Sequence, residues 1–356
     1  MWREWLIRLA MVTVSIVLVL LATELLLRAW WGNGLTEDDL RERLESSREA
    51  SPDEARGPFS LYGLVQASDL PDVVYELKPH LDGTFRDQPI RTNSFGLRDD
   101  EIAVEKPLGT FRIVGLGDSH MFGWGVAQGE PWLDVAERTL NEAGAPRRFE
   151  VVNCAAPGYN TTMEVALFEH ECRAFEPDLV VVSFVRNDFR LPHFLQPPRE
   201  LSSVAQWYLA EVVRAALRPS EDDEIPDLLL HDRSELPAEV RDGARRRYEY
   251  MVGAEAFRRA LERLDALTSE PPVPVIFAVV GTDDPETRQA VAMAEEQGFV
   301  VLDFGSALIA YLRDHRIAQN KAQWKKQFQL VGDSHPSPLA HRILGETFAA
   351  EVLQRL

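Results

Sequence analysis

Residues 111–125 read FRIVGLGDSHMFGWG and place an apolar run directly before a glycine-rich turn. The run from Phe111 to Leu116 is short and bounded by glycine, which is typical of a buried parallel strand. Open parallel sheets hold their ligands at the carboxyl ends of the strands. The turn at 115–125 therefore lies where a substrate would bind.

Three common glycine-rich motifs do not fit this turn. A dinucleotide-binding turn needs a third glycine that opens a helix, but here Asp-Ser-His follows the Gly-x-Gly at 115–117. A phosphate-binding loop needs Gly-Lys-Ser/Thr, and this turn contains no lysine. The serine elbow G-x-S-x-G also fails, because Met121 stands in place of its second glycine. The remaining interpretation is that Ser119 itself is the reactive group.

The chain after this turn alternates between strand and helix patterns. Such alternation predicts an α/β domain with a parallel sheet. The further strands are expected at 149–155, 179–185, 273–280 and 299–304, and helices at 131–140, 161–175, 238–269, 284–297 and 338–356.

We divide the chain into three parts on this basis. Residues 1–32 are a membrane anchor or signal peptide, 33–107 a polar spacer and N-terminal extension, and 108–356 the catalytic domain. An insertion at about 190–270 separates the third and fourth strands, and it is too long for a plain connection. Its first part, 190–236, is either a lid over the site or a passive surface insertion, and the sequence leaves both open.

The N-terminal segment has the composition of a membrane helix. Leu9–Thr23 is uncharged, and Leu6–Leu27 approaches the ~20 residues of a spanning helix if Arg8 and Glu24 are tolerated near its ends. We favour an uncleaved transmembrane helix over a cleaved signal peptide or a buried helix of a soluble domain. Basic residues before the run and acidic residues after it predict an extracytoplasmic catalytic domain, either periplasmic or at the cell surface.

Charge and cysteine content exclude several classes of protein. The net charge of −19 would repel a phosphate backbone, so nucleic-acid binding is not expected. The two cysteines, Cys154 and Cys172, cannot form a disulfide framework or a cysteine-based zinc cluster. They form either one bridge or two buried thiols, and we favour the thiols.

A serine nucleophile needs a base and an oxyanion hole. His335 lies in a loop that leads into the last helix, and Asp333 is close enough to orient it. Gly158 could supply a backbone N–H and Asn187 a side-chain amide, because they follow the next two predicted strands. These residues make an acyl-transfer site the best interpretation.

Four short blocks, in this order, resemble the SGNH (GDSL-like) hydrolase superfamily over about residues 108–356. The blocks are Gly117-Asp118-Ser119, Asn153-x-x-x-Pro157-Gly158, Asn187-Asp188 and Asp333-Ser334-His335-Pro336. The stretch Asn93-x-x-Gly96-Leu97-Arg98 also resembles a subset of bacterial, membrane-anchored members.

The resemblance implies a flavodoxin-like three-layer α/β/α fold with a five-stranded parallel sheet. It implies Ser119 as nucleophile, His335 as base, and an oxyanion hole formed by Ser119 N–H, Gly158 N–H and Asn187 Nδ2. It implies that no cofactor is required. A metal site is not expected, because His335 and His341 stand six residues apart without a pattern of carboxylates.

Two positions depart from the family pattern. The usual place of the acid, three residues before the histidine, holds Gly332, so either Asp333 or a backbone carbonyl orients His335. His120 replaces a hydrophobic residue, and we expect its side chain to point away from the site.

We therefore predict a membrane-anchored serine hydrolase that cleaves an acyl or acetyl ester, with an envelope carbohydrate or lipid as a candidate for the alcohol. One alternative is an O-acyltransferase of an envelope polysaccharide, in which a sugar hydroxyl replaces water. A second alternative is a non-catalytic binding module on the same fold.

Overall fold

The computed structural model describes residues 2–31, 58–59, 61–144, 146–190, 192, 209 and 248–356. The chain divides into two compact units, residues 1–43 with 194–247 and residues 44–193 with 248–356. The predicted spacer up to residue 57 and most of the predicted insertion, including the proposed lid, lie outside the described residues.

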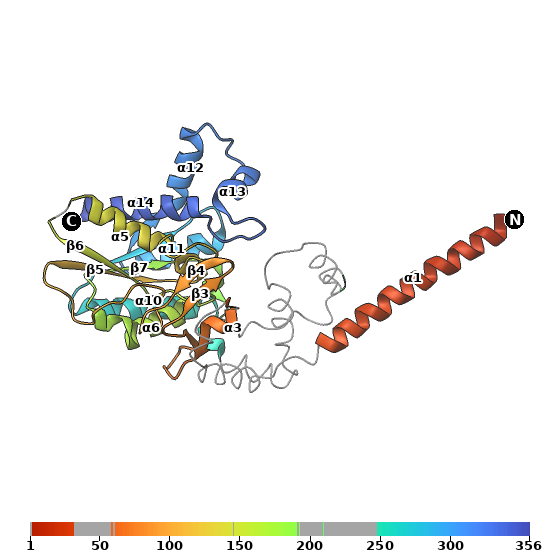
Figure 1. The fold of residues 1–356 in the computed structure, drawn as a ribbon, viewed down its shortest axis with the longest axis horizontal. Helices are drawn as coiled ribbons and strands as arrows, with labels where there is room; N and C mark the ends of the chain where they lie inside the picture. The colour runs from red at the N-terminus through yellow and green to blue at the C-terminus, as the bar shows by residue number, and fades with distance from the viewer. Residues whose placement is uncertain are drawn as a thin grey trace. The chain divides into compact units, whose positions relative to one another are not determined.

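A five-stranded parallel sheet forms the centre of the second unit (Figure 1). Its strands are β5 (Thr110–Leu116), β6 (Arg148–Asn153), β7 (Leu179–Ser183), β8 (Val275–Val279) and β9 (Val300–Asp303). Their order is β6-β5-β7-β8-β9, and every neighbouring pair is parallel. All residues of β7 and β8 are buried, which explains why both strands are continuous apolar runs. The predicted α/β class and parallel sheet are confirmed.

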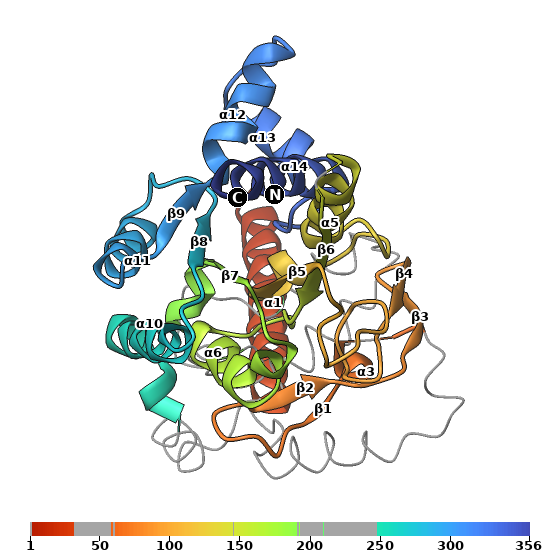
Figure 2. The same ribbon diagram turned by 90° about the vertical axis from the view of Figure 1, so that its left-hand side faces the viewer.

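Helices cover both faces of this sheet (Figure 2). On one face lie α5 (Trp132–Glu142), α12 (Phe304–Asp314) and α14 (Pro338–Arg355); on the other lie α6 (Thr161–His170), α10 (Gly253–Ser269) and α11 (Pro285–Glu296). Helices α5 and α14 pack closely at Gly345. A Cβ at this position would lie 2.5 Å from the Trp132 carbonyl oxygen, so only glycine leaves room for the contact. The Trp132 ring meets Phe348 edge-on at 5.3 Å.

The sequence prediction contains neither α12 nor α13 (Lys321–Phe328). Helix α12 begins directly at the end of β9, where Asp303 is both the last strand residue and the N-cap whose side chain accepts from Gly305 N. With no connecting loop, no turn residue marks the boundary between the two elements in the sequence.

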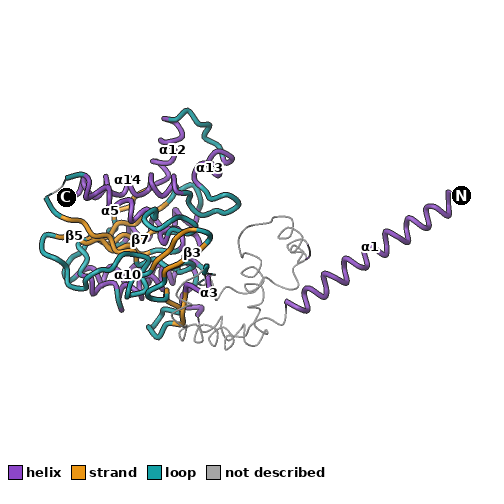
Figure 3. The backbone as a smooth tube through the Cα atoms, viewed as in Figure 1, coloured by secondary structure: helices purple, strands orange, loops and turns teal. Residues whose placement is uncertain are grey.

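The N-terminal extension folds onto the same unit as the sheet (Figure 3). It contains α3 (Leu61–Leu64) and two antiparallel hairpins, β1 (Val65–Ala67) with β2 (Tyr75–Leu77) and β3 (Asp82–Phe85) with β4 (Gln88–Arg91). The buried Arg112 of β5 donates to the carbonyls of Ala103 at 3.0 Å and Val104 at 3.1 Å, which ties the end of the extension to the sheet.

Helix α1 (Trp2–Trp31) occupies the predicted apolar segment. None of the helices in the described part of the chain is long and apolar enough to cross a membrane, so the predicted transmembrane helix is not supported. The acidic residue that interrupts the apolar run, Glu24, is 5% exposed, and its carboxylate accepts a hydrogen bond from Leu209 N at 2.8 Å.

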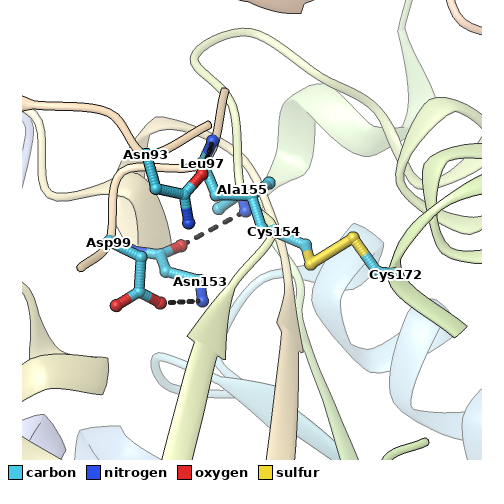
Figure 4. Close-up of a disulfide and its surroundings, with 7 residues drawn as sticks. All are labelled: Asn93, Leu97, Asp99, Asn153, Cys154, Ala155 and Cys172. Atoms are coloured by element: carbon cyan, nitrogen blue, oxygen red, sulfur yellow. Dashed lines mark hydrogen bonds between the residues drawn. A yellow bond between two sulfur atoms is a disulfide. The ribbon is translucent and has the colours of Figure 1, made fainter. Parts of the chain in front are cut away.

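Cys154 and Cys172 form a disulfide, so the expectation of two free thiols is wrong (Figure 4). Cys154 directly follows β6, and Cys172 begins the short helix η1 (Cys172–Phe175) after α6. The return of the chain over the end of β6 brings the two Cα atoms to 6.8 Å, within bridging range. Next to the bridge, Asn153 N donates to Asp99 of the extension at 3.0 Å.

We expect the double variant Cys154→Ala, Cys172→Ala to lose about 3 kcal/mol of unfolding free energy, because the bridge closes a short loop in the unfolded chain. Denaturant unfolding measures this loss. Thiol titration of unfolded, unreduced wild type should find no free thiol, and the single variant Cys172→Ala should show one. Two titratable thiols in the oxidised wild type would contradict the bridge.

Candidate active site

Ser119 is the first residue of the short helix α4 (Ser119–Phe122), which follows β5 after a tight turn. Asp118 caps this helix by accepting a hydrogen bond from His120 N at 2.9 Å. Position 117 must be glycine, because a Cβ there would lie 2.5 Å from Ser183 Oγ. Strand β5 has β6 on one side and β7 on the other, so the serine lies at the switch point of the sheet, where ligands bind.

The structure brings Ser119, His335 and Asp333 into one hydrogen-bonded chain. Ser119 Oγ lies 2.8 Å from His335 Nε2, and His335 Nδ1 lies 2.6 Å from Asp333 Oδ1. With the proton on Nδ1, the imidazole donates to Asp333 and accepts from the serine hydroxyl. The three predicted catalytic side chains therefore have the mutual geometry of a Ser-His-Asp triad.

The choice between Asp333 and a backbone carbonyl as the partner of His335 is decided by the loop itself. Gly332 has a φ of 80°, which turns the chain immediately before the aspartate. Asp333 Oδ1 accepts from the backbone N–H of His335 at 3.0 Å as well as from its ring. One oxygen thus fixes both the loop and the imidazole, although the aspartate lies only two residues before the histidine.

The electrostatics of the site favour a charged Asp333 and a neutral His335. Burial raises the pKa of Asp333, but hydrogen bonds and charge from His335, together with the Arg86 charge, outweigh it and hold this pKa below its usual range. Burial, together with the neighbouring His120, lowers the pKa of His335 and outweighs the raising influence of Asp333 and Asp118. The imidazole can therefore accept a proton at neutral pH.

Two side chains that the sequence did not assign to the site also contact Asp333. Trp124 Nε1 donates to Asp333 Oδ2 at 3.1 Å, and the Trp124 ring stacks on His335 with centroids 4.9 Å apart. Arg86 donates to the same oxygen at 3.3 Å. Trp124 lies five residues after Ser119 in a Gly-Trp-Gly stretch, which was its only sequence indication, whereas nothing in the sequence marked Arg86.

Gly158 and Asn187 lie after β6 and β7, the two strands beside β5. Gly158 has a φ of 75°, a conformation that favours glycine. Asn187, in the short helix η2 (Arg186–Phe189), donates through Nδ2 to Asp118 Oδ2 at 2.9 Å and to the Tyr159 carbonyl at 3.3 Å. The Asn187 side chain thus joins the turn that carries Ser119 to Tyr159, the residue after Gly158, by hydrogen bonds.

The N-terminal extension supports this edge of the sheet from outside. The Tyr75 hydroxyl donates to the Pro157 carbonyl at 2.7 Å, directly before Gly158. Arg98, which is buried, donates to the carbonyls of Phe122 at 3.1 Å and Val126 at 2.7 Å, at the end of α4 and just beyond it. The stretch 93–98, singled out in the sequence, therefore holds the serine helix in place.

His120 does not point away from the site as expected. Its ring centroid lies 5.0 Å from that of His335, and its Nδ1 lies 3.5 Å from Asp118 Oδ1. The expectation assumed a strand-end turn on which neighbouring side chains diverge, but residues 119 and 120 lie in the first turn of a helix.

The buried His341 accepts from Trp132 N at 3.2 Å, and the described residues contain no cluster of metal ligands.

A model of the GDSL-like lipase/acylhydrolase family matches residues 116–343. The chain belongs to this family. It is therefore an SGNH/GDSL-type esterase. The matched region contains the serine, the histidine, the aspartate and both predicted oxyanion residues, whereas Tyr75, Arg86 and Arg98 precede it.

Solved structures with a similar fold were also found. A lipase/acylhydrolase from Enterococcus faecalis is 17% identical, with a TM-score of 0.40, over 69% of this chain and 97% of that one. The acetylxylan esterase Axe2 from Geobacillus stearothermophilus is 16% identical, with a TM-score of 0.39, over 68% of this chain and 94% of that one. No curated protein sequence matches the chain.

The lowered pKa of His335 predicts the acid limb of this esterase. We expect the midpoint of this limb to lie below about 6.5, the ordinary histidine value, because the rate falls only as His335 becomes protonated. Asp333→Asn should slow the reaction by roughly 10³–10⁴-fold. It should also shift the midpoint of the limb to lower pH, because the carboxylate raises the pKa of His335. A midpoint above 6.5 in the wild type would contradict this assignment.

Proposed function

We propose that Ser119 hydrolyses a carboxylic ester in two acyl-transfer steps. The observation that carries this proposal is the uninterrupted hydrogen-bond chain from Ser119 Oγ through His335 to Asp333, with contacts of 2.8 and 2.6 Å. A serine hydroxyl becomes a useful nucleophile only when a base removes its proton, and this chain supplies that base.

In the first step, Ser119 Oγ attacks the ester carbonyl while its proton moves to His335 Nε2. The resulting imidazolium stays bound to the Asp333 carboxylate and then protonates the departing alcohol. In the second step, His335 removes a proton from water, which attacks the acyl-serine and releases the carboxylic acid. Ser119 recovers its proton, so the enzyme returns to its starting state.

Three donors are proposed to stabilise the oxyanion of both steps: the N–H groups of Ser119 and Gly158 and the side-chain amide of Asn187. Asp118 supports this assignment, because its buried carboxylate accepts from Asn187 Nδ2 and caps the helix that begins at Ser119. The bond to Asp118 keeps the amide ordered, and the second N–H, which donates to the Tyr159 carbonyl at 3.3 Å, would transfer to the oxyanion. Donors that are already oriented in this way are the effective ones.

We also propose that the catalytic domain works outside the cytoplasm. The Cys154–Cys172 bridge supports this location, because disulfides persist mainly in oxidising compartments.

Labelling of the folded full-length chain with a fluorophosphonate tests the proposed nucleophile. The Ser119 Oγ–phosphorus bond forms, fluoride leaves, and the hydroxyl proton passes to His335. We expect Ser119→Ala to abolish labelling and His335→Ala to slow it by roughly 10³-fold or more.

The matched control is Ser306→Ala, which removes an exposed serine of α12 and should leave labelling unchanged. Unlabelled wild type should release acid from p-nitrophenyl acetate at a rate that Ser119→Ala lacks, and prior labelling should abolish this release. Absence of labelling in folded wild type would reject the serine-hydrolase function, and labelling that survives Ser119→Ala would reject this serine.

A further inference from the structure

The turn that joins β3 and β4 has an unfavourable sequence for its backbone. Phe85 pairs with Gln88, so Arg86 and Asp87 are the two central residues of a tight hairpin. Both have positive φ, 50° and 60°. Asn-Gly and Asp-Gly are the usual residues in such a turn, because the left-handed region disfavours larger side chains. Strain of this kind is often retained where a side chain has a function.

The Arg86 side chain leaves this turn toward the triad rather than toward solvent. It is 14% exposed, which is low for a charged side chain at the tip of a hairpin. Its guanidinium lies 4.9 Å from the Trp124 ring centroid and donates to Asp333 Oδ2 at 3.3 Å. Phe85 meets the Trp124 ring edge-on at 4.8 Å, so the hairpin and the tryptophan pack as one group.

The contacts of Asp333 divide cleanly between its two oxygens. Oδ1 accepts from the ring and the backbone N–H of His335, whereas Oδ2 accepts from Arg86 and Trp124. Both oxygens are therefore held, and the carboxylate cannot rotate without losing a hydrogen bond. This is a means of aligning an acid that stands one position away from the usual place in the family pattern.

We propose that Arg86 is a positioning residue for this reaction: with Trp124, it fixes the Asp333 carboxylate against His335, so the N-terminal extension helps to align the catalytic triad. This inference rests on the proposed function, because it assigns Arg86 a role in activating Ser119. It goes beyond the family resemblance, since Arg86 lies outside the region 116–343 that the family model matches.

The charge of Arg86 also predicts a measurable pH effect. The charged and titratable groups that interact with His335 are Asp118, His120, Asp333 and the buried His341, and Arg86 lies behind Asp333. The Arg86 cation offsets part of the carboxylate charge that stabilises the imidazolium. Removing it should raise the pKa of His335, which is the opposite of the shift expected for Asp333→Asn.

The test is the pH dependence of fluorophosphonate labelling, measured on the full-length chain for Arg86→Asn, Arg86→Lys and Arg91→Asn. Asparagine suits the left-handed turn, so Arg86→Asn should fold with a thermal midpoint close to that of wild type. We expect it to label roughly tenfold more slowly at neutral pH, because the acid is less well aligned. Its acid limb should move upward by roughly half a pH unit to one unit.

Arg86→Lys keeps the charge and should restore the position of the acid limb, while recovering only part of the rate. Arg91 is the matched control, because it lies on the same hairpin but is exposed, and its guanidinium pairs with the exposed Asp100 carboxylate at 3.5 Å. Arg91→Asn should reproduce the wild-type profile.

The outcomes separate this proposal from the proposed function. Wild type that does not label would overturn both. If wild type is labelled and the pH profile of Arg86→Asn superimposes on the wild-type profile, the positioning role alone would be overturned. A lowered thermal midpoint with an unchanged acid limb would assign Arg86 to hairpin stability and would also overturn the role, as would equal losses in Arg86→Asn and Arg91→Asn.

Discussion

The imidazole of His335 must contact two side chains at once, and the rest of the site depends on this requirement. Ser119 lies 216 positions away in the sequence. Helix α14 packs on α5 and fixes one end of the histidine loop, and Leu330 N donates to the His335 carbonyl at 3.0 Å across the base of that loop. The parallel sheet supplies the other half, because the carboxyl ends of β5, β6 and β7 share one edge.

The N-terminal extension braces this edge at three separate points. Tyr75 donates a hydrogen bond to the backbone carbonyl before Gly158, and Arg98 donates to a carbonyl at the end of α4. Arg86 donates to the carboxylate of Asp333. Each contact uses a side chain of the extension to satisfy a polar group of the catalytic domain. Strand-end loops are the least constrained parts of an α/β fold, so these contacts restrict the loops that carry the candidate site residues.

The fold was predictable where the chain carries a strong local pattern. The continuous apolar run of β7 and the glycine-bounded run of β5 marked buried strands, and the sheet follows from them. Prediction failed where two elements join without a turn, as at Asp303, and where short strands lack alternation, as in the hairpins of the extension. The apolar segment at the N-terminus was predicted to be a transmembrane helix, but the helix found there does not support it.

The sequence by itself determined the order of the catalytic blocks and the identity of Ser119, His335, Gly158 and Asn187 as candidates, because each directly follows a strand or precedes a helix with a clear pattern. Only the tertiary structure decided that Asp333 is the partner of His335, that His120 faces the site, and that the two cysteines are joined. Local periodicity encodes where a strand ends. The directions in which loop side chains point depend on contacts between segments that are distant in the chain.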